Sequence, residues 1–408
     1  MNTAPHSRLL FIDWLRIAAF ALLIPYHVGM YYVSWGWHVK NPVIHESIEP
    51  LMLLSNPWRM GLLFLIGGVA ASQLMGKLQS RWKFVRERSS RLLWPLLFGM
   101  AVVVPIQPYL EVVQKLGYAG SYLDFLGLYF KAYHGFCESG GKCLDLPTWN
   151  HLWFLPYLWI YCLLGAMLAK PLARGGQVLQ HGLQGPRGGL WLAGLCLPLM
   201  AARCFYGLFP VTHNLTWDWY NHMVSLWLFL VGWMAASQAP ALWTWAERLR
   251  WPALAVFLAG WLGFGLYIRH YVDHDPSQFV LYTQRLLYGL KQGAALLAVL
   301  GFGKRHLDRD HRWRAGLSAA VFCAYVLHQS VIVGLTPLLE PLQLPDSLEA
   351  LLLIGLTFLA CAVVYRLARP VPGLRRLLGI AAPKTPGRQA APREATMALS
   401  QASTAQQP

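Results

Sequence analysis

Apolar runs long enough to cross a bilayer recur along the whole of this 408-residue chain. About 20 mostly apolar residues are needed for a helix to cross a hydrocarbon core of about 30 Å. Because backbone polar groups need partners inside a membrane, such runs fold as helices. The sequence therefore predicts an all-α, polytopic membrane protein of about ten transmembrane helices. The predicted spans are 9–33, 58–76, 92–110, 151–169, 190–208, 222–239, 252–270, 281–300, 316–336 and 349–367.

The charge of the chain is unusual in amount and in position. Only 13% of residues are charged, against about 25% in soluble domains. The net charge of +16 could indicate a nucleic-acid-binding protein. However, most Lys and Arg residues fall in loops on one side of the predicted spans, as expected for cytoplasmic loops. We therefore expect no nucleic-acid partner.

The basic loops also predict the orientation of the chain. The loops between the basic ones hold most of the acidic residues. An even number of spans then places both termini on the basic, cytoplasmic side (N-in and C-in). Residues 1–380 form the predicted membrane domain, and 381–408, rich in Ala, Pro, Gln, Ser and Thr, a disordered cytoplasmic tail. The basic loops are 77–91, 170–189, 240–251 and 301–315.

The first span, 9–33, carries three ionisable residues: Asp13, Arg16 and His27. It also lacks a small-residue cleavage site after it, so we expect it to be retained rather than removed as a signal peptide. A charged residue at membrane depth costs at least about 2.5–3.5 kcal/mol, so it usually has a partner or a function. At 100° per residue, Arg16 and His27 lie only about 20° apart around the helix. Pro25 predicts a kink just before His27.

The three ionisable residues suggest different roles. His27, near the outer end, could act as a general base, because a neutral imidazole can take a proton from an alcohol near pH 7. The alternative is a core histidine with its hydrogen bonds satisfied. Arg16 lies about 16 Å away on the cytoplasmic side, where it could meet an anionic donor with Asp13 as its partner. Alternatively, Asp13 and Arg16 form a self-contained pair that only stabilises helix packing.

Two further histidines fall at the same predicted height as His27. His151 begins one span from the outside, and His328 lies in the outer half of another. We expect them to orient the acceptor or to stabilise charge. Three histidines at one depth favour a site over three unrelated core residues.

Cationic residues also gather near this height. Arg59 and Arg285 could bind a donor carboxylate or the developing oxyanion, although an arginine at a helix end can also extend to the interface. We prefer that second interpretation for Arg269. Lys291, close to Tyr288, could bind an anion as well or be neutralised by burial.

The loop 77–91 carries Arg86, Arg88 and Arg91. In part it determines topology, but arginine forks also match phosphate geometry, so these three could bind the phosphates of a coenzyme A donor. In a loop on the opposite side, Cys137 and Cys143 could form a disulfide if that side is a periplasm, or stay as free thiols. No zinc-type spacing or Gly-rich nucleotide loop occurs, so we expect no metal and no permanently bound cofactor.

Taken together, these residues resemble the membrane-bound acyltransferase-3 superfamily. The resemblance rests on Asp13-x-x-Arg16, on His27, on RERSSR at 86–91, on HLWFL at 151–155 and on YVLHQ at 325–329. PYHVGMYYVSWGWHVKNP (25–42) and WRMGLLFLIGG (58–68) resemble the periplasmic glucan biosynthesis protein C branch, which is linked to succinyl decoration of osmoregulated glucans.

This resemblance implies about ten membrane helices, an acyl-coenzyme A donor and a carbohydrate acceptor. It implies that catalysis depends on His27 and that Arg86, Arg88 and Arg91 form the basic motif. One departure occurs at Gly67-Gly68, where relatives tend to carry Ser-Gly, so this chain lacks a hydroxyl there.

The sequence thus predicts a multi-pass acyltransferase of the bacterial inner membrane. It would move an acyl group, with succinyl from succinyl-CoA as a candidate, from a cytoplasmic thioester to a hydroxyl of a periplasmic or cell-surface glycan. Glucan-synthesis proteins are candidate partners. One alternative is a transporter of acylated sugar or lipid, because intramembrane charges and Pro-interrupted helices also occur in transporters. Another is a scaffold for glucan synthesis, in which His27 would be dispensable.

Overall fold

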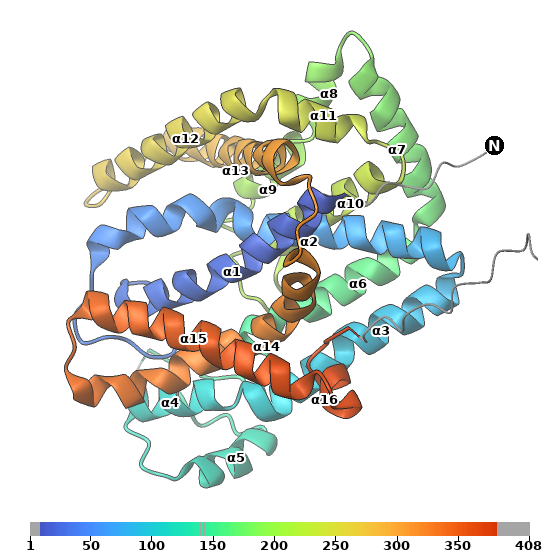
Figure 1. The fold of residues 1–408 in the computed structure, drawn as a ribbon. Coiled ribbons are helices and arrows are strands. Elements are labelled where there is room, and N and C mark those ends of the chain that lie inside the picture. The colour runs from blue at the N-terminus through green and yellow to red at the C-terminus, as the bar shows by residue number, and fades with distance from the viewer. Residues whose placement is uncertain (1–8, 139, 142, 382–408) are drawn as a thin grey trace, which may run out of the picture.

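The structure, a computed structural model, describes residues 9–138, 140–141 and 143–381. Within these ranges the regular structure is helical (Figure 1), apart from one isolated bridge between Cys137 and Cys143. The predicted tail, 381–408, lies outside the described residues except for Ala381. The α-helices are α1 (Leu10–Tyr32), α2 (Glu49–Leu78), α3 (Arg81–Phe98), α4 (Ile106–Leu116), α5 (Tyr122–Phe130), α6 (Phe154–Met167), α7 (Ala169–Gln184), α8 (Gly188–Gly194), α9 (Leu197–Cys204), α10 (Trp219–Ser237), α11 (Ala241–Arg248), α12 (Arg250–His270), α13 (Gln278–Leu307), α14 (Arg314–Leu339), α15 (Asp346–Ala368) and α16 (Pro372–Leu377). The short elements are η1 (Glu46–Ile48), η2 (Gly99–Val103), η3 (Asn150–Trp153) and η4 (Glu340–Leu342).

The all-α, polytopic prediction is confirmed. Within the described ranges, 7 helices are long and apolar enough to cross a membrane, or up to 9 if each of two bent helix pairs is one span. These pairs are α6 with α7, bent by 84°, and α10 with α11, bent by 110°. The predicted span 190–208 is instead divided between the short helices α8 and α9. The count of ten and the N-in, C-in orientation therefore stay predictions.

Helix α1 lies in the middle of the molecule, between α2 on one side and α14 and α15 on the other (Figure 1). It also contacts α13. By contrast, α12 and α15 bury few of their side chains inside the protein, as expected for helices that face lipid. Helix α1 continues through Pro25. Its central place explains how residues along one helix can reach several others.

Two glycines allow α2 and α10 to pack closely. A Cβ atom on Gly68 would lie 1.9 Å from the Phe229 carbonyl oxygen, and one on Gly232 would lie 2.0 Å from the Leu65 carbonyl oxygen. Small residues of this kind let helix backbones approach within a membrane. A Cβ on Gly67, by contrast, would meet only the Leu158 side chain, at 2.7 Å. Packing therefore requires glycine at 68 more strictly than at 67.

Local sequence signals explain the ends of several helices. The hydroxyl of Ser80 accepts from the Lys83 N–H at the start of α3, and Ser277 caps α13 in the same way. Such caps satisfy N–H groups that lack a partner within the helix. Between α3 and α4, the π-helical turn η2 widens the helix. Turns of this type often occur at functional sites, and this one precedes Gln107, which lies in the site described next.

Candidate functional site

A cavity of about 1030 Å³ lies beside the C-terminal half of α1, which we call the outer half after its predicted orientation. It is lined by residues from α1, α2, α4, η3, α9, α10, α12, α13 and α14, together with the loop that follows α1. Its wall includes both aromatic and polar side chains. Among them are Tyr26, His27, Trp37, Arg59, His151 and Gln329.

His27 and His328 are hydrogen-bonded to each other, with 2.9 Å between Nδ1 of His27 and Nε2 of His328. Nδ1 of His328 lies 2.7 Å from the Tyr325 carbonyl oxygen. A carbonyl can only accept, so Nδ1 of His328 donates and, in the neutral ring, its Nε2 accepts from His27. Nε2 of a neutral His27 then keeps its lone pair, and this atom has no hydrogen-bond partner within the described ranges. The ring also stacks on Trp37, 5.1 Å between centroids.

His151 is held through both of its ring nitrogens. Its Nε2 lies 3.0 Å from the Val326 carbonyl oxygen, and its Nδ1 lies 3.1 Å from Nε2 of Gln107. The His151 ring stands edge-on to His328, 5.2 Å between centroids. The structure thus brings together the three predicted histidines, but only His27 keeps a ring nitrogen without a protein partner in the described part of the chain.

Gln107 joins this site to a polar network that the sequence did not reveal. Its Oε1 accepts from Nδ2 of Asn150 at 3.1 Å and from Nε2 of Gln329 at 3.0 Å. Nε2 of Gln329 also lies 3.0 Å from Nε2 of His38, whose Nδ1 lies 2.6 Å from Glu111. One signal could have indicated the network: Gln107 and Glu111 are polar and one turn apart at the end of an apolar run.

The predicted cations separate into two groups. Arg59 lines the cavity, and its guanidinium lies 3.4 Å from the Tyr26 ring centre. Tyr288 lines the cavity as well. Arg285 instead donates to the Cys204 carbonyl at 3.2 Å, and the cavity lining does not include it. Of these two predicted anion-binding arginines, only Arg59 therefore belongs to the cavity lining.

Lys291 is 1% exposed and does not itself line the cavity. Its ammonium lies 4.0 Å from the Tyr288 ring centre, so it stands behind the wall that Tyr288 contributes. Arg203, which is half-buried, does line the cavity, and its guanidinium lies 4.0 Å from the centre of the same ring.

The other end of α1 carries an ionic cluster around Asp13. Arg16 lies 3.3 Å from Oδ1 of Asp13, and Arg314 lies 2.7 Å from Oδ2. Arg314 is 5% exposed and also bonds to Asp310, at 2.8 Å and 3.1 Å. Arg16 donates in addition to the Ser318 hydroxyl. The Asp13–Arg16 pair is therefore not self-contained, because it is part of a cluster that joins α1 to α14.

The three arginines of the basic motif occupy different environments. Arg88 is half-buried and donates to the Ala70 carbonyl at 2.9 Å, whereas Arg86 and Arg91 are exposed. Arg91 lies within electrostatic range of Arg88 and of Arg16. The basic motif and the ionic cluster thus lie near each other.

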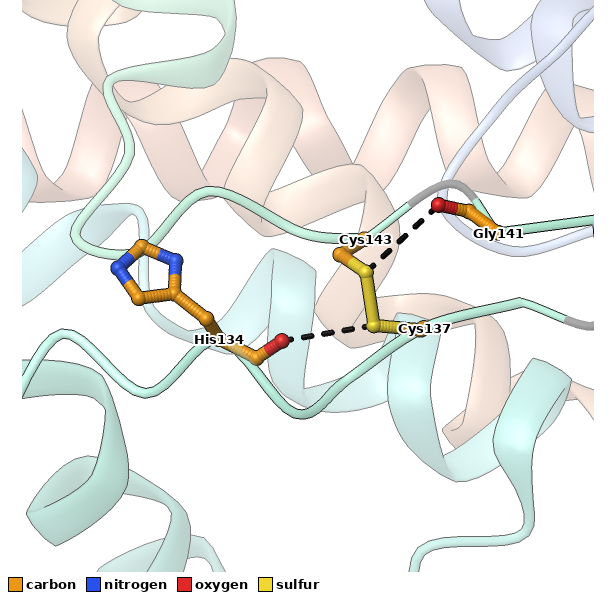
Figure 2. The surroundings of a disulfide bond; sticks show 4 residues. All are labelled: His134, Cys137, Gly141 and Cys143. Atoms are coloured by element: carbon orange, nitrogen blue, oxygen red, sulfur yellow. Dashed lines mark hydrogen bonds between the residues drawn. A yellow bond between two sulfur atoms is a disulfide. The ribbon is translucent and has the colours of Figure 1, made fainter.

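A disulfide joins Cys137 and Cys143 in the loop after α5 (Figure 2). Cys137 Sγ lies 3.4 Å from the His134 carbonyl oxygen. The loop also carries Glu138, which lies 3.5 Å from the ammonium of Lys115 on α4. Both residues line the cavity, so the disulfide fixes a loop at its rim.

Lys40 caps the outer end of α1. Its ammonium donates to the carbonyls of Met30 and Val33, at 2.7 Å and 2.5 Å. These carbonyls have no partner within the helix, and cations near a helix C-terminus are favourable. Burial, helped by nearby Lys115, lowers the pKa of Lys40 to about 8.

Among the described residues, no group of three or more His, Cys, Asp or Glu could hold a metal ion. A family model described as an acyltransferase domain, of the acyltransferase-3 type, matches residues 9–366. No curated protein and no solved structure matches the chain.

Proposed function

The chain belongs to the acyltransferase-3 family and is a membrane acyltransferase, and from this premise we propose that it acylates a glycan outside the cytoplasm. The donor would be a cytoplasmic thioester, an acyl-coenzyme A, with succinyl-CoA as the candidate. The acceptor would be a hydroxyl of a periplasmic or cell-surface glycan such as osmoregulated glucan. The site of action would be the bacterial inner membrane.

One observation carries this proposal: the free lone pair on Nε2 of His27, in a ring held by His328 and Trp37, at the wall of a large cavity. A neutral imidazole fixed in this tautomer can take a proton from a sugar hydroxyl. The hydroxyl oxygen then attacks the thioester carbonyl, a C–O bond forms, the C–S bond breaks, and coenzyme A leaves as its thiol or thiolate. Aromatic rings along the cavity are suited to stack on sugar.

The same atom could instead carry the acyl group. In that alternative Nε2 of His27 attacks the thioester, and the glycan hydroxyl takes the acyl group in a second step. Trapping with labelled acyl-coenzyme A in the absence of acceptor distinguishes the two routes, because only the second leaves label on the protein. Arg59 is placed near His27 and would stabilise negative charge on the reacting oxygen.

The donor would enter from the other end of α1. Arg88 and Arg91 would bind phosphate groups, and Arg16 lies close to them. About 16 Å of helix separates Arg16 from His27, so the flexible arm of the donor would bridge this length while its nucleotide stays on the cytoplasmic side.

The test is acyl transfer by purified protein in proteoliposomes that receive labelled acyl-coenzyme A and glycan. His27→Ala should lower the rate by about 10²–10⁴-fold, the usual range for a lost general base. His181→Ala, on the exposed face of α7, is the matched control and should keep its rate. Normal transfer by His27→Ala would refute the catalytic role, and movement of acylated sugar without any transfer would favour a transporter.

A further inference from the structure

Two cations share one aromatic ring at the wall of the cavity. The ammonium of Lys291 and the guanidinium of Arg203 each lie 4.0 Å from the ring centre of Tyr288, so they are at most about 8 Å apart. Lys291 also lies 4.2 Å from the Phe264 ring centre. Tyr206 adds a further ring, 3.9 Å from the Arg203 guanidinium. We call Arg203 and Lys291 the cation pair.

The cation pair makes no salt bridge within the described ranges of the chain. Nζ of Lys291 has no hydrogen-bond partner there, and neither does Nε of Arg203. Removing a charge from water is costly unless an anion partners it, and a cation–π contact returns only part of that cost. The rings therefore offset only part of the cost of two charges at this place.

The acidic residues that line the same cavity are bound elsewhere. Glu49 accepts from the backbone and hydroxyl of Ser34. Glu111 bonds to His38 and, at 2.7 Å, to Lys115. Glu138, the remaining acid of the lining, lies 3.5 Å from Lys115. Thus the protein supplies partners for the acids of the cavity and leaves the cation pair without an anion.

Arg203 is the member of the cation pair that reaches the cavity. The Tyr206 and Tyr288 rings lie against the Arg203 guanidinium, and its Nη1 donates to the Tyr220 hydroxyl at 3.4 Å. A guanidinium has five N–H donors, so others remain for an anion. Arg203 lines the cavity beside Gln292, which is fixed by donating to the Pro57 carbonyl at 2.6 Å. Arg59 on the same cavity wall is 6% exposed, and its Nε also lacks a hydrogen-bond partner in the described structure.

We propose that the cation pair binds an anionic oxygen group of the substrate, a carboxylate or a phosphate, while the reacting groups meet at His27. Arg203 would donate to the anion directly. Lys291, behind the Tyr288 ring, would add electrostatic attraction that is strong because water is excluded there. The anion would belong either to the far end of the acyl group or to a charged substituent of the glycan. This inference rests on the proposed function and narrows its substrate class.

Two assay arms separate the two sources. The donor arm compares succinyl-CoA with butyryl-CoA as donors to one neutral gluco-oligosaccharide. Both acyl groups have four carbons, and only the succinyl group has a terminal carboxylate. The acceptor arm keeps butyryl-CoA and compares this oligosaccharide with its 6-phosphate. In one of the arms the anionic substrate should have a kcat/KM at least about tenfold higher, the effect of about 1.4 kcal/mol. A ratio near one in both arms, in a protein that transfers acyl groups, would overturn the proposal.

Variants test whether Arg203 and Lys291 cause the preference for the anionic substrate. Arg203→Gln and Lys291→Met each remove the charge and keep much of the side-chain length. Both should lower the anionic-to-neutral ratio of kcat/KM at least fivefold. The matched control is Arg269→Gln, at the exposed end of α12, which should keep the wild-type ratio. An unchanged ratio in both cation-pair variants would also overturn the proposal.

A binding measurement tests whether the cation pair binds an anion, without any catalytic turnover. Monomethyl succinate and inorganic phosphate should raise the unfolding temperature of the wild-type protein in detergent, because a ligand of the folded state stabilises it. Dimethyl succinate, which is neutral, should not, and the shift should shrink in Lys291→Met. Equal effects of the charged and neutral esters, with none from phosphate, would exclude the anion site. If no donor–acceptor pair reacts in the wild type, the proposed function fails, but this measurement still tests the site.

Discussion

The two ends of α1, which are outer and inner in the predicted orientation, are polar in opposite ways. At the outer end His27 belongs to a set of neutral groups joined by hydrogen bonds that run in fixed directions, from His27 to His328 and on to a backbone carbonyl. At the inner end Asp13 belongs to a set of full charges, in which Arg16 and Arg314 share one carboxylate. One helix therefore carries two different solutions to the cost of polar groups inside a membrane protein.

The difference indicates different tasks. A neutral chain of donors and acceptors has a direction, so it can leave one lone pair without a partner and aim it at a cavity. In an ionic cluster the opposite charges neutralise each other and hold the helices together. Removing one partner of a buried ion pair strongly destabilises the protein. Changes at the outer end should therefore reduce turnover, whereas changes at the inner end should reduce stability first.

The largest of these effects is expected for His328→Ala. Without the acceptor at Nε2 of His328, His27 loses the bond that fixes its tautomer and its ring orientation. We expect kcat to fall about 100-fold, as for other small displacements of a reacting group, with little change in KM for the donor. Steady-state kinetics in proteoliposomes measures both constants.

Partial rescue distinguishes positioning from simple packing. In His328→Gln the amide oxygen can still accept from Nδ1 of His27, so this variant should recover at least about tenfold of the lost kcat. If the alanine and glutamine variants are equally slow and bind the donor normally, the hydrogen bond is not what positions His27.

At the inner end the expected effect is on stability rather than on turnover. Asp13→Asn removes the charge that Arg314 and Arg16 share, but Asp310 remains bound to Arg314. The loss should be about 1.5–3 kcal/mol of unfolding free energy, as for a hydrogen bond to a charged group, with less than about a threefold change in kcat. Unfolding in detergent, followed by tryptophan fluorescence, measures it.

The control at this end is Asp310→Asn. Asp310 has 65% of its side chain exposed, and exposed pairs contribute about 0–1 kcal/mol, so this variant should lose clearly less stability. Equal losses for Asp13→Asn and Asp310→Asn would show that burial does not separate the two carboxylates.

Much of the helix content and the meeting of the three histidines could be predicted from the sequence. Apolar runs of spanning length and the 3.6-residue period are local signals, so His27, His151 and His328 could be placed at one height. The division of 190–208 into two short helices could not be predicted, because hydropathy records composition and not the turn at Leu195 and Cys196.

Partners from distant helices were harder to predict. Arg314 is one of several basic residues near the end of a basic loop. The local sequence does not show that Arg314, rather than a neighbouring basic residue, is buried beside Asp13. In the same way, Arg285 and Arg203 are both arginines near outer helix ends, yet only Arg203 reaches the cavity. The rotation of each helix about its axis determines which arginine reaches a buried partner or the cavity. This rotation depends on close contacts between helices, such as that of Gly68 with Phe229.

The smallest expected effect tests the contrast between charge and neutrality directly. Raising the ionic strength shortens the Debye length from about 10 Å at 0.1 M to about 3 Å at 1 M, so it should weaken the Asp13–Arg314 coupling energy by a few tenths of a kcal/mol. A double-mutant cycle with Asp13→Asn and Arg314→Met, from unfolding free energies at both salt concentrations, measures this coupling.

The His27–His328 coupling, measured from kcat with His27→Gln and His328→Gln, should not respond to salt, because neither ring carries a charge before the proton moves. A salt response of similar size in both cycles would mean that the outer pair is charged at rest, and His27 could then not be the base.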